Sequence, residues 1–226
     1  MHAAFPTAAL LEVYGTTELA PRATALIDEH QLLDQPRARS CGRAIPGVRL
    51  RVLDPAGRLA PRGTIGEIVV RGPNVMLGYW NKPAETAAAL KDGEFRTGDL
   101  GYLDEEGYLF LVDRSKDMIV AGSENVYSTE VEAVLHRHSA VLEAAAFGIP
   151  DDKWGEAVHA TVVLGPQQRD TTAAELIDFC RQAIAGYKVP KRIDIRTEPL
   201  PKSAAGKILK RELRAPFWAG RRRAVN

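Results

Sequence analysis

The chain has 226 residues, of which 45% are hydrophobic and 26% are charged, and its formal net charge at pH 7 is +1. These values are ordinary for a globular protein and allow one large or two small domains. A net charge so close to zero excludes recruitment of nucleic acid by an overall positive field, and no stretch approaches the roughly 18 apolar residues of a membrane span.

Cysteine usage and the first residues indicate a reducing compartment. Cys41 and Cys180 lie far apart in the sequence and outside any CxxC spacing. We therefore expect neither a disulfide framework nor a zinc site, and the cytoplasm is the default location. Residues 1–15 lack a basic n-region, so they are not predicted to form a signal peptide.

The first half of the chain reads as strand-rich and irregular. Residues 48–53 alternate apolar and basic side chains, which predicts a half-buried strand, and glycines bound a second strand over 66–72. Pro83 is expected in the first turn of a short helix. Residues 102–103 and 108–112 are predicted to form a hairpin around an acidic turn.

The second half changes character. A hairpin over 117–127 is predicted to lead into a helix that begins with a capping box of Thr129 and Glu132. Residues 141–149 and 157–164 are expected to be core strands.

A second capping box, Thr172 with Glu175, is predicted to open another helix that ends at Gly186. Its apolar face consists of Leu176, Ile177, Cys180 and Ile184. A strand over 192–196 follows. Residues 1–113 are therefore predicted to be a β-rich module, 114–215 an α+β module and 216–226 a disordered basic tail.

The hexamer VYGTTE at residues 13–18 suggests nucleotide chemistry. A tyrosine face such as that of Tyr14 can stack on a purine, while Thr17 offers a hydroxyl to phosphate and Glu18 a carboxylate to Mg²⁺. The alternative is a surface turn with a half-buried tyrosine, and the hexamer alone favours that alternative.

Two further short motifs suit a ribose. Asp99, in TGD, has a carboxylate that accepts hydrogen bonds from vicinal hydroxyls, and Arg114, in DRSKD, has a planar donor for a second contact. The alternatives are an Asx turn for Asp99 and a solvated charged linker for Arg114.

The segment PKSAAGKILK at 201–210 is not a P-loop, because it lacks the first glycine and has Ile208 where a metal-binding Ser or Thr would stand. What remains is Lys207 on a small-residue loop that could carry positive charge to an anionic centre, or simply a solvated lysine. His136 and His138 are two residues apart, so they point to different helix faces and are not a metal pair. His159 lies in an apolar strand and reads as a core residue.

Taken in order, these motifs resemble the adenylate-forming superfamily of acyl-CoA synthetases, luciferases and peptide-synthetase adenylation domains. The resemblance runs from Tyr14 to about Arg214 and includes SKDMI and ENVY, which are typical of bacterial fatty-acid–CoA ligases. It implies an α+β fold, with a β-rich, distorted-barrel portion of a large N-terminal domain followed by a small α+β lid domain.

The resemblance also implies roles for individual residues. Tyr14 would stack on adenine, Thr17 and Glu18 would hold phosphate and Mg²⁺, and Asp99 and Arg114 would bind the ribose of ATP and of the acyl-adenylate. Three residues would belong to the lid chemistry: a hinge, a lysine for adenylation, and a glycine that makes room for coenzyme A, namely Lys116, Lys207 and Gly122. Ser128 stands where the family usually has proline, and serine can also cap a helix.

The implied activity is ATP-dependent activation of a fatty or other carboxylic acid, followed by transfer to coenzyme A. The superfamily's phosphate loop and acyl pocket lie upstream of the adenine motif, so the chain is expected to be a C-terminal fragment without adenylation activity of its own. A complementary N-terminal chain is one expected partner; nucleic acid is not, and membrane contact would be at most peripheral. The alternatives are a non-catalytic nucleotide- or partner-binding remnant, or an adenylating enzyme that loads a carrier protein.

Overall fold

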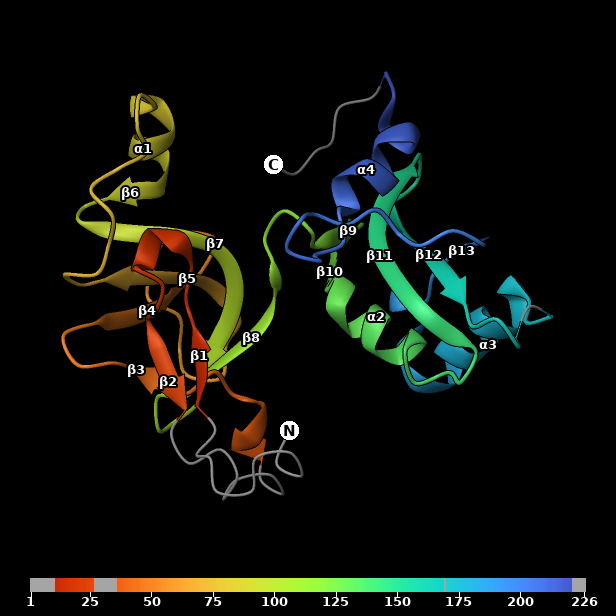
Figure 1. The fold of residues 1–226 in the computed structure, drawn as a ribbon, viewed down its shortest axis with the longest axis horizontal. Helices are drawn as coiled ribbons and strands as arrows, with labels where there is room; N and C mark the ends of the chain where they lie inside the picture. Colours follow the sequence, from red (N-terminus) through yellow and green to blue (C-terminus); the bar gives the residue numbers. More distant parts are fainter. Residues whose placement is uncertain (1–10, 27–35, 169, 221–226) are drawn as a thin grey trace. The chain divides into compact units, whose positions relative to one another are not determined.

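The computed structural model describes residues 11–26, 36–168 and 170–220. Contacts divide the chain into two compact units between Ser115 and Lys116. The sequence had predicted a boundary between Asp113 and Arg114. We describe each unit by itself (Figure 1).

The first unit contains two antiparallel sheets. One has the order β1-β2-β3, and the other has the order β4-β5-β7-β6 with β8 also paired to β7. Among the described residues, two 3₁₀ helices and one α-helix connect the strands. The elements are β1 (Glu12–Tyr14), η1 (Thr17–Leu19), β2 (Thr24–Leu26), η3 (Pro36–Arg39), β3 (Arg43–Ala44), β4 (Arg49–Leu53), β5 (Gly66–Arg71), α1 (Pro83–Ala89), β6 (Leu90–Lys91), β7 (Glu94–Leu103) and β8 (Leu109–Arg114).

Strand β7 curls the larger sheet. Its pairing shifts register against β5 between Glu67 and Val69, and against β8 between Leu100 and Gly101. Such irregularities bend a strand and increase its twist, and Figure 1 shows β7 strongly curved. The β-rich, barrel-like character predicted for this part of the chain is confirmed, as are the strands, the hairpin and the helix at Pro83.

One apolar core joins the two sheets of the first unit. Its fully buried members are Leu19 of η1, Ala23, and three residues of the larger sheet, Ile68, Val70 and Leu109. Tyr14 of β1 belongs to the same cluster. The motif VYGTTE is therefore anchored to the larger sheet through Tyr14 and through Leu19, the residue that follows it.

The second unit is a mixed sheet with helices. The sheet has the order β10-β9-β12-β11, and β13 lies parallel to β12. The elements are β9 (Ile119–Ala121), β10 (Glu124–Val126), α2 (Ser128–Leu135), β11 (Val141–Asp151), β12 (Gly155–Leu164), α3 (Ala173–Ala183), η4 (Gly186–Lys188), β13 (Arg192–Arg196), α4 (Lys210–Arg214) and η5 (Ala215–Trp218).

Alternation along β11 gives this sheet two buried faces. Ala144 and Ala146 pack in the cluster that contains Leu135 of α2 and Leu176 of α3. Phe147, which points to the opposite face, packs in a second cluster with residues of α4 and η5. A small sheet covered by helices on both faces fits the α+β class, which is confirmed.

The two predicted capping boxes had different outcomes. Thr172 and Glu175 form theirs: the Thr172 hydroxyl accepts from the Glu175 N–H at 3.2 Å, and the Glu175 carboxylate accepts from the Thr172 N–H at 2.8 Å. The box at Thr129 was wrong, because α2 already begins at Ser128 and the Glu132 carboxylate instead accepts from the Ala146 N–H.

The predicted end of helix α3 and the predicted C-terminal tail also differ from the structure. Helix α3 ends at Ala183, and Gly186 begins η4 instead of stopping the helix. Part of the predicted tail is ordered: η5 covers 215–218, where Phe217 packs on the sheet and the Trp218 indole N–H donates to the Gly148 carbonyl at 3.0 Å. Residues 221–226 lie outside the described residues. No helix within the described ranges is long and apolar enough to cross a bilayer.

Candidate active site

Asp99 is the centre of a buried polar cluster in the first unit. The Tyr14 hydroxyl donates to Asp99 Oδ2 at 2.9 Å, and Arg114 Nε donates to Asp99 Oδ1 at 3.1 Å. The Asp99 N–H is held by the Thr97 hydroxyl at 3.0 Å. Both carboxylate oxygens are thus oriented by the protein, and each retains a lone pair for a further donor.

The local sequence explains how Asp99 and Arg114 meet. They are directly opposite each other in the β7–β8 ladder, a position that brings side chains of adjacent strands together. Gly98, at φ +69°, adopts the left-handed conformation that precedes the aspartate. Its carbonyl accepts from the Ser115 N–H at 2.9 Å, which continues the pairing to the end of the unit.

Tyr14 is a fixed donor to this carboxylate. Burial raises the pKa of its phenol, and the charge of Asp99 raises it further. The hydroxyl therefore stays protonated at physiological pH. Only 6% of the residue is exposed, so the described chain presents little open ring face, and stacking on adenine stays a prediction.

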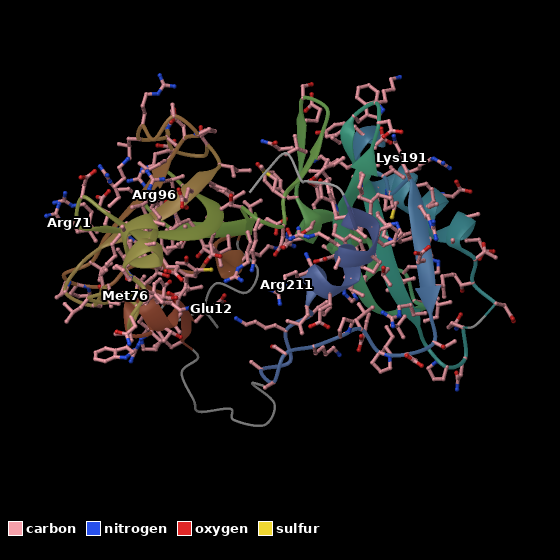
Figure 2. The ribbon with its side chains drawn as sticks, turned by 90° about the horizontal axis from the view of Figure 1, so that it is seen from above. Glu12, Arg71, Met76, Arg96, Lys191 and Arg211 are labelled. Atoms are coloured by element: carbon pink, nitrogen blue, oxygen red, sulfur yellow. The ribbon has the colours of Figure 1, made fainter. Side chains whose placement is uncertain are left out.

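Glu18 lies in η1 and is held by the segment that follows β5. The Tyr79 hydroxyl donates to Glu18 Oε1 at 2.9 Å, and the N–H of Met76, labelled in Figure 2, donates to the Glu18 carbonyl at 2.8 Å. Partial burial opposes ionisation, but hydrogen bonds from the backbone and from Tyr79, with the charge of Arg114, outweigh it and lower the pKa of Glu18. Sequence reasoning missed Tyr79, because nothing in the motif points to a tyrosine so far along the chain.

Gly15 and Thr17 of VYGTTE differ in their surroundings: the backbone closely encloses Gly15, whereas Thr17 is exposed. A Cβ atom on Gly15 would lie 1.8 Å from the Pro21 carbonyl oxygen, so any other residue would force the turn open. Thr17 begins η1 and is exposed, next to Glu18. The hexamer therefore presents a hydroxyl and a carboxylate from one tight turn.

A magnesium ion fits this arrangement only together with a phosphorylated ligand. Among the described residues, no group of three or more His, Cys, Asp or Glu side chains is placed to hold a metal. Glu18 supplies one ionised carboxylate, and proteins commonly hold Mg²⁺ through one or two carboxylates with phosphate oxygens and water completing the shell.

Lys207 lies in the second unit, on a short turn. The Gly206 N–H donates to the Ser203 carbonyl and the Ser203 N–H to the Lys207 carbonyl, each at 2.8 Å, and Lys202 pairs with Ile208 across the base of the turn. Lys207 is exposed. Its amine is therefore presented to solvent by a closed turn.

Gly122 and Lys116 also lie in the second unit. Gly122 sits between β9 and β10 at φ +70°, and a Cβ there would be 2.8 Å from Cε3 of Trp154, a residue that sequence reasoning missed. Lys116 is the first residue of the unit, and its carbonyl accepts from Arg214 Nη1 at 3.1 Å. The structure thus unites Tyr14, Asp99 and Arg114, while Lys116, Gly122 and Lys207 occupy three places in the other unit.

Comparison with known proteins decides the family. Residues 1–80 match the AMP-binding enzyme family, and residues 130–207 match the AMP-binding enzyme C-terminal domain. The chain belongs to the AMP-binding enzymes. These two matches lie on the two sides of the division at Ser115, and the resemblance to the adenylate-forming superfamily is confirmed.

Curated relatives of this AMP-binding chain include fatty-acid ligases. The fatty acid–[acyl-carrier-protein] ligase ScoC of Streptomyces coeruleorubidus is 41% identical over 215 residues, which are 95% of this chain and 41% of the relative. A long-chain-fatty-acid–CoA ligase of Salmonella typhimurium is 44% identical over 205 residues, or 91% of this chain and 35% of the relative. The chain therefore spans well under half the length of these relatives.

Comparison with solved structures agrees with this family assignment. The o-succinylbenzoate CoA synthetase MenE of Bacillus subtilis, in complex with an acyl-adenylate intermediate, superposes with a TM-score of 0.82 at 36% identity, covering 91% of this chain and 41% of that one. A further structure of MenE, with a TM-score of 0.80 at 36% identity and coverage of 91% and 41%, holds ATP and a magnesium ion.

Proposed function

We propose that this chain carries the ribose-binding and lid portions of an ATP-dependent acid–thiol ligase, which forms an acyl-adenylate and then a thioester. The observation that supports this most is the carboxylate of Asp99, held at one oxygen by Tyr14 and at the other by Arg114. A fixed carboxylate beside a guanidinium suits two adjacent ribose hydroxyls.

Adenylation solves a leaving-group problem. A carboxylate is a poor acyl donor because its leaving group would be oxide, whereas attack of a carboxylate oxygen on the α-phosphorus of ATP expels pyrophosphate and gives a mixed anhydride. Asp99 and Arg114 hold the nucleoside in this step, and Thr17 orients a phosphate oxygen. Mg²⁺ bound through Glu18 and phosphate would neutralise charge that gathers there, and the ammonium of Lys207 adds a second positive charge.

The thiol then attacks the acyl carbon and AMP leaves. Lys207 has no role in this second step, while a glycine such as Gly122 allows a pantetheine arm to pass close to the backbone. Lys116 serves as the hinge for the exchange. Its neighbourhood suits that role, because the chain is hydrogen-bonded on both sides of it: Ser115 to Gly98 and the Lys116 carbonyl to Arg214. Motion is thereby confined to the few backbone bonds between these two anchors.

Fatty acids are the proposed acyl substrates, by similarity to the two curated ligases. Coenzyme A is the proposed acceptor. A carrier protein is a second candidate, and similarity to ScoC, an acyl-carrier-protein ligase at 41% identity, favours it. Incubation of preformed fatty acyl-adenylate with coenzyme A in one reaction and holo-carrier protein in another separates the two: thioester on coenzyme A supports the first acceptor, and thioester on the carrier alone supports the second.

Titration with nucleotides lacking ribose hydroxyls tests the site itself. We expect calorimetry to detect AMP binding at millimolar concentration and 2′,3′-dideoxy-AMP to bind about tenfold or more weakly, since it removes donors to a charged acceptor. Equal affinity for the two nucleotides would contradict the assignment of Asp99. Binding of AMP without thioester formation would instead support the alternative of a nucleotide-binding module.

A further inference from the structure

Two acid–base contacts hold the base of the Lys207 turn. On its entry side, Lys202 Nζ lies 2.5 Å from Glu143 Oε1 of β11, and the other oxygen of Glu143 accepts from the Leu200 N–H at 2.9 Å. The Glu143 side chain is 17% exposed. The hydrogen bond from Lys202 is the first cause of a lowered pKa for Glu143, so the carboxylate stays charged.

On the exit side, Lys210 enters a buried polar cluster on α2. Its Nζ lies 2.7 Å from Glu132 Oε1 and donates to the Ser128 hydroxyl at 2.6 Å. The side chains of Lys210 and Glu132 are only 14% and 17% exposed, and Ser128 is fully buried. Glu132 also accepts from the Ala146 N–H of β11 at 2.8 Å, so this contact ties the start of α4, marked by Arg211 in Figure 2, to both α2 and the sheet.

Burial makes the Lys210–Glu132 contact the more consequential of the two, since the Lys202 side chain is 40% exposed. A buried ammonium or carboxylate is stable only when it is paired and hydrogen-bonded, and removing one partner leaves an uncompensated charge. Lys202 and Lys210 flank the turn, whose ends are already joined by the pairing of Lys202 with Ile208. With both ends fixed to β11 and α2, the direction in which Lys207 leaves the turn is fixed as well.

We propose that Glu143 and Glu132, acting through Lys202 and Lys210, are positioning residues that orient Lys207 for the adenylation step. The structural part of this inference is that these contacts keep the backbone of the Lys207 turn ordered. Its catalytic part rests on the proposed function of Lys207.

The same helix supplies a matched control. Glu130, two residues before Glu132 on α2, pairs with Lys188 Nζ at 2.8 Å, and their side chains are 38% and 20% exposed. Neither residue contacts the turn by a described hydrogen bond or ion pair. Glu130→Gln therefore removes an ion pair of α2 without touching the base of the turn.

Amide hydrogen exchange tests the structural part on the full chain. In Glu132→Gln and in Glu143→Gln, we expect the N–H groups of Ser203, Gly206 and Leu209 to exchange at least about tenfold faster than in the unchanged chain, while amides of β12 keep their rates. Glu130→Gln should leave the turn unchanged. Lys210→Met should behave like Glu132→Gln, whereas Lys210→Arg, which keeps the charge, should retain most of the protection. Equal acceleration by Glu130→Gln and Glu132→Gln, or no change at the turn in either, would overturn the inference.

A comparison of the two half-reactions, measured with a complementary N-terminal chain that supplies the phosphate loop and acyl pocket, tests the catalytic part. Glu132→Gln should slow formation of acyl-adenylate from ATP about tenfold or more, with little effect on thioester formation from supplied acyl-adenylate. Faster exchange at the turn with both half-reactions unaffected would refute the catalytic role and leave the ligase function standing. Absence of acyl transfer in every variant and in the unchanged chain, even with the complementary N-terminal chain present, would instead count against the proposed function, while the exchange result still decides the structural part.

Discussion

Glu18 is the residue for which charge and geometry give the most direct prediction. Its carboxylate is held by Tyr79 and kept ionised by its surroundings. Glu18→Gln keeps the shape but not the charge. We expect it to weaken magnesium-dependent ATP binding about ten- to hundredfold, since one contact to a charged group contributes about 1.5–3 kcal/mol, while AMP binding without magnesium stays the same. Calorimetry with and without Mg²⁺ measures this, with Glu85→Gln on α1 as the control; equal loss in both conditions would exclude a role in metal binding.

His159 predicts how the stability of the second unit depends on pH. It is fully buried against Phe147 and Phe217, and neither ring nitrogen makes a hydrogen bond among the described residues, although Nε2 lies 3.5 Å from Asp194 Oδ2. Burial lowers its pKa to about 4, against the opposing charge of Asp194. The unfolded chain therefore binds a proton more readily, so stability is full above about pH 6.5 and falls as the pH drops toward 4.

Replacement of His159 tests the predicted direction of this pH dependence of stability. Between pH 7 and pH 5 the unchanged chain should lose up to about 2 kcal/mol of unfolding free energy through this group. His159→Leu should lose that share of the pH dependence without destabilising the protein at pH 7, because it removes two buried polar atoms that make no hydrogen bond. Urea denaturation of both proteins at the two pH values gives the comparison. An unchanged pH dependence in the variant would contradict the account.

At the scale of elements, helix α3 begins with a capping box that the sequence predicted and the structure contains. Thr172→Ala removes the hydroxyl that accepts from the Glu175 N–H and should lower the unfolding free energy by about 1 kcal/mol. Thr171→Ala, one residue before the cap, is the control and should have an effect below about 0.5 kcal/mol. Similar losses in the two variants, measured by urea denaturation, would mean that the cap contributes no specific stability.

The stability of the β9–β10 hairpin depends on Gly122 for both backbone conformation and space. Comparison with Gly155 separates these two effects. Gly122 and Gly155 have similar positive φ angles, +70° and +76°, but only at Gly122 would a Cβ meet another side chain, that of Trp154. Gly155→Ala should cost about 1 kcal/mol through the backbone alone. Gly122→Ala should cost more in urea denaturation and, with a complementary N-terminal chain present, should slow thioester formation without slowing adenylation. Equal costs at the two positions would remove the steric argument.

At the scale of the whole molecule, patterns of a few residues predicted most of the elements. Arg192–Arg196 and the capped helix α3 follow from alternation and capping chemistry, which act locally. The order of motifs led to the family, which the comparisons confirm. Asp99 and Arg114 could be assigned to one site from that resemblance, and their opposite places in the β7–β8 ladder agree with it.

What the sequence did not predict depends on contacts between distant segments. Tyr79 reaches Glu18 from 61 positions away, and Lys210 reaches Ser128 from 82. Thr129 has the local signature of a cap, but the pairing of Glu132 with Lys210 and the Ala146 N–H prevailed over it. Likewise, residues 216–226 were predicted to be a disordered basic tail, but Phe217 packs against the sheet.

The central claim is that Asp99 binds the ribose of a nucleotide, and calorimetry of AMP with Asp99→Asn tests it most directly. The matched control is Glu67→Gln, which breaks an ion pair with Arg96 on the same sheet, 2.6 Å long. We predict a loss of affinity of about ten- to hundredfold for Asp99→Asn, the effect of losing a charged acceptor, and no change for Glu67→Gln. Undiminished AMP binding by Asp99→Asn would contradict the claim.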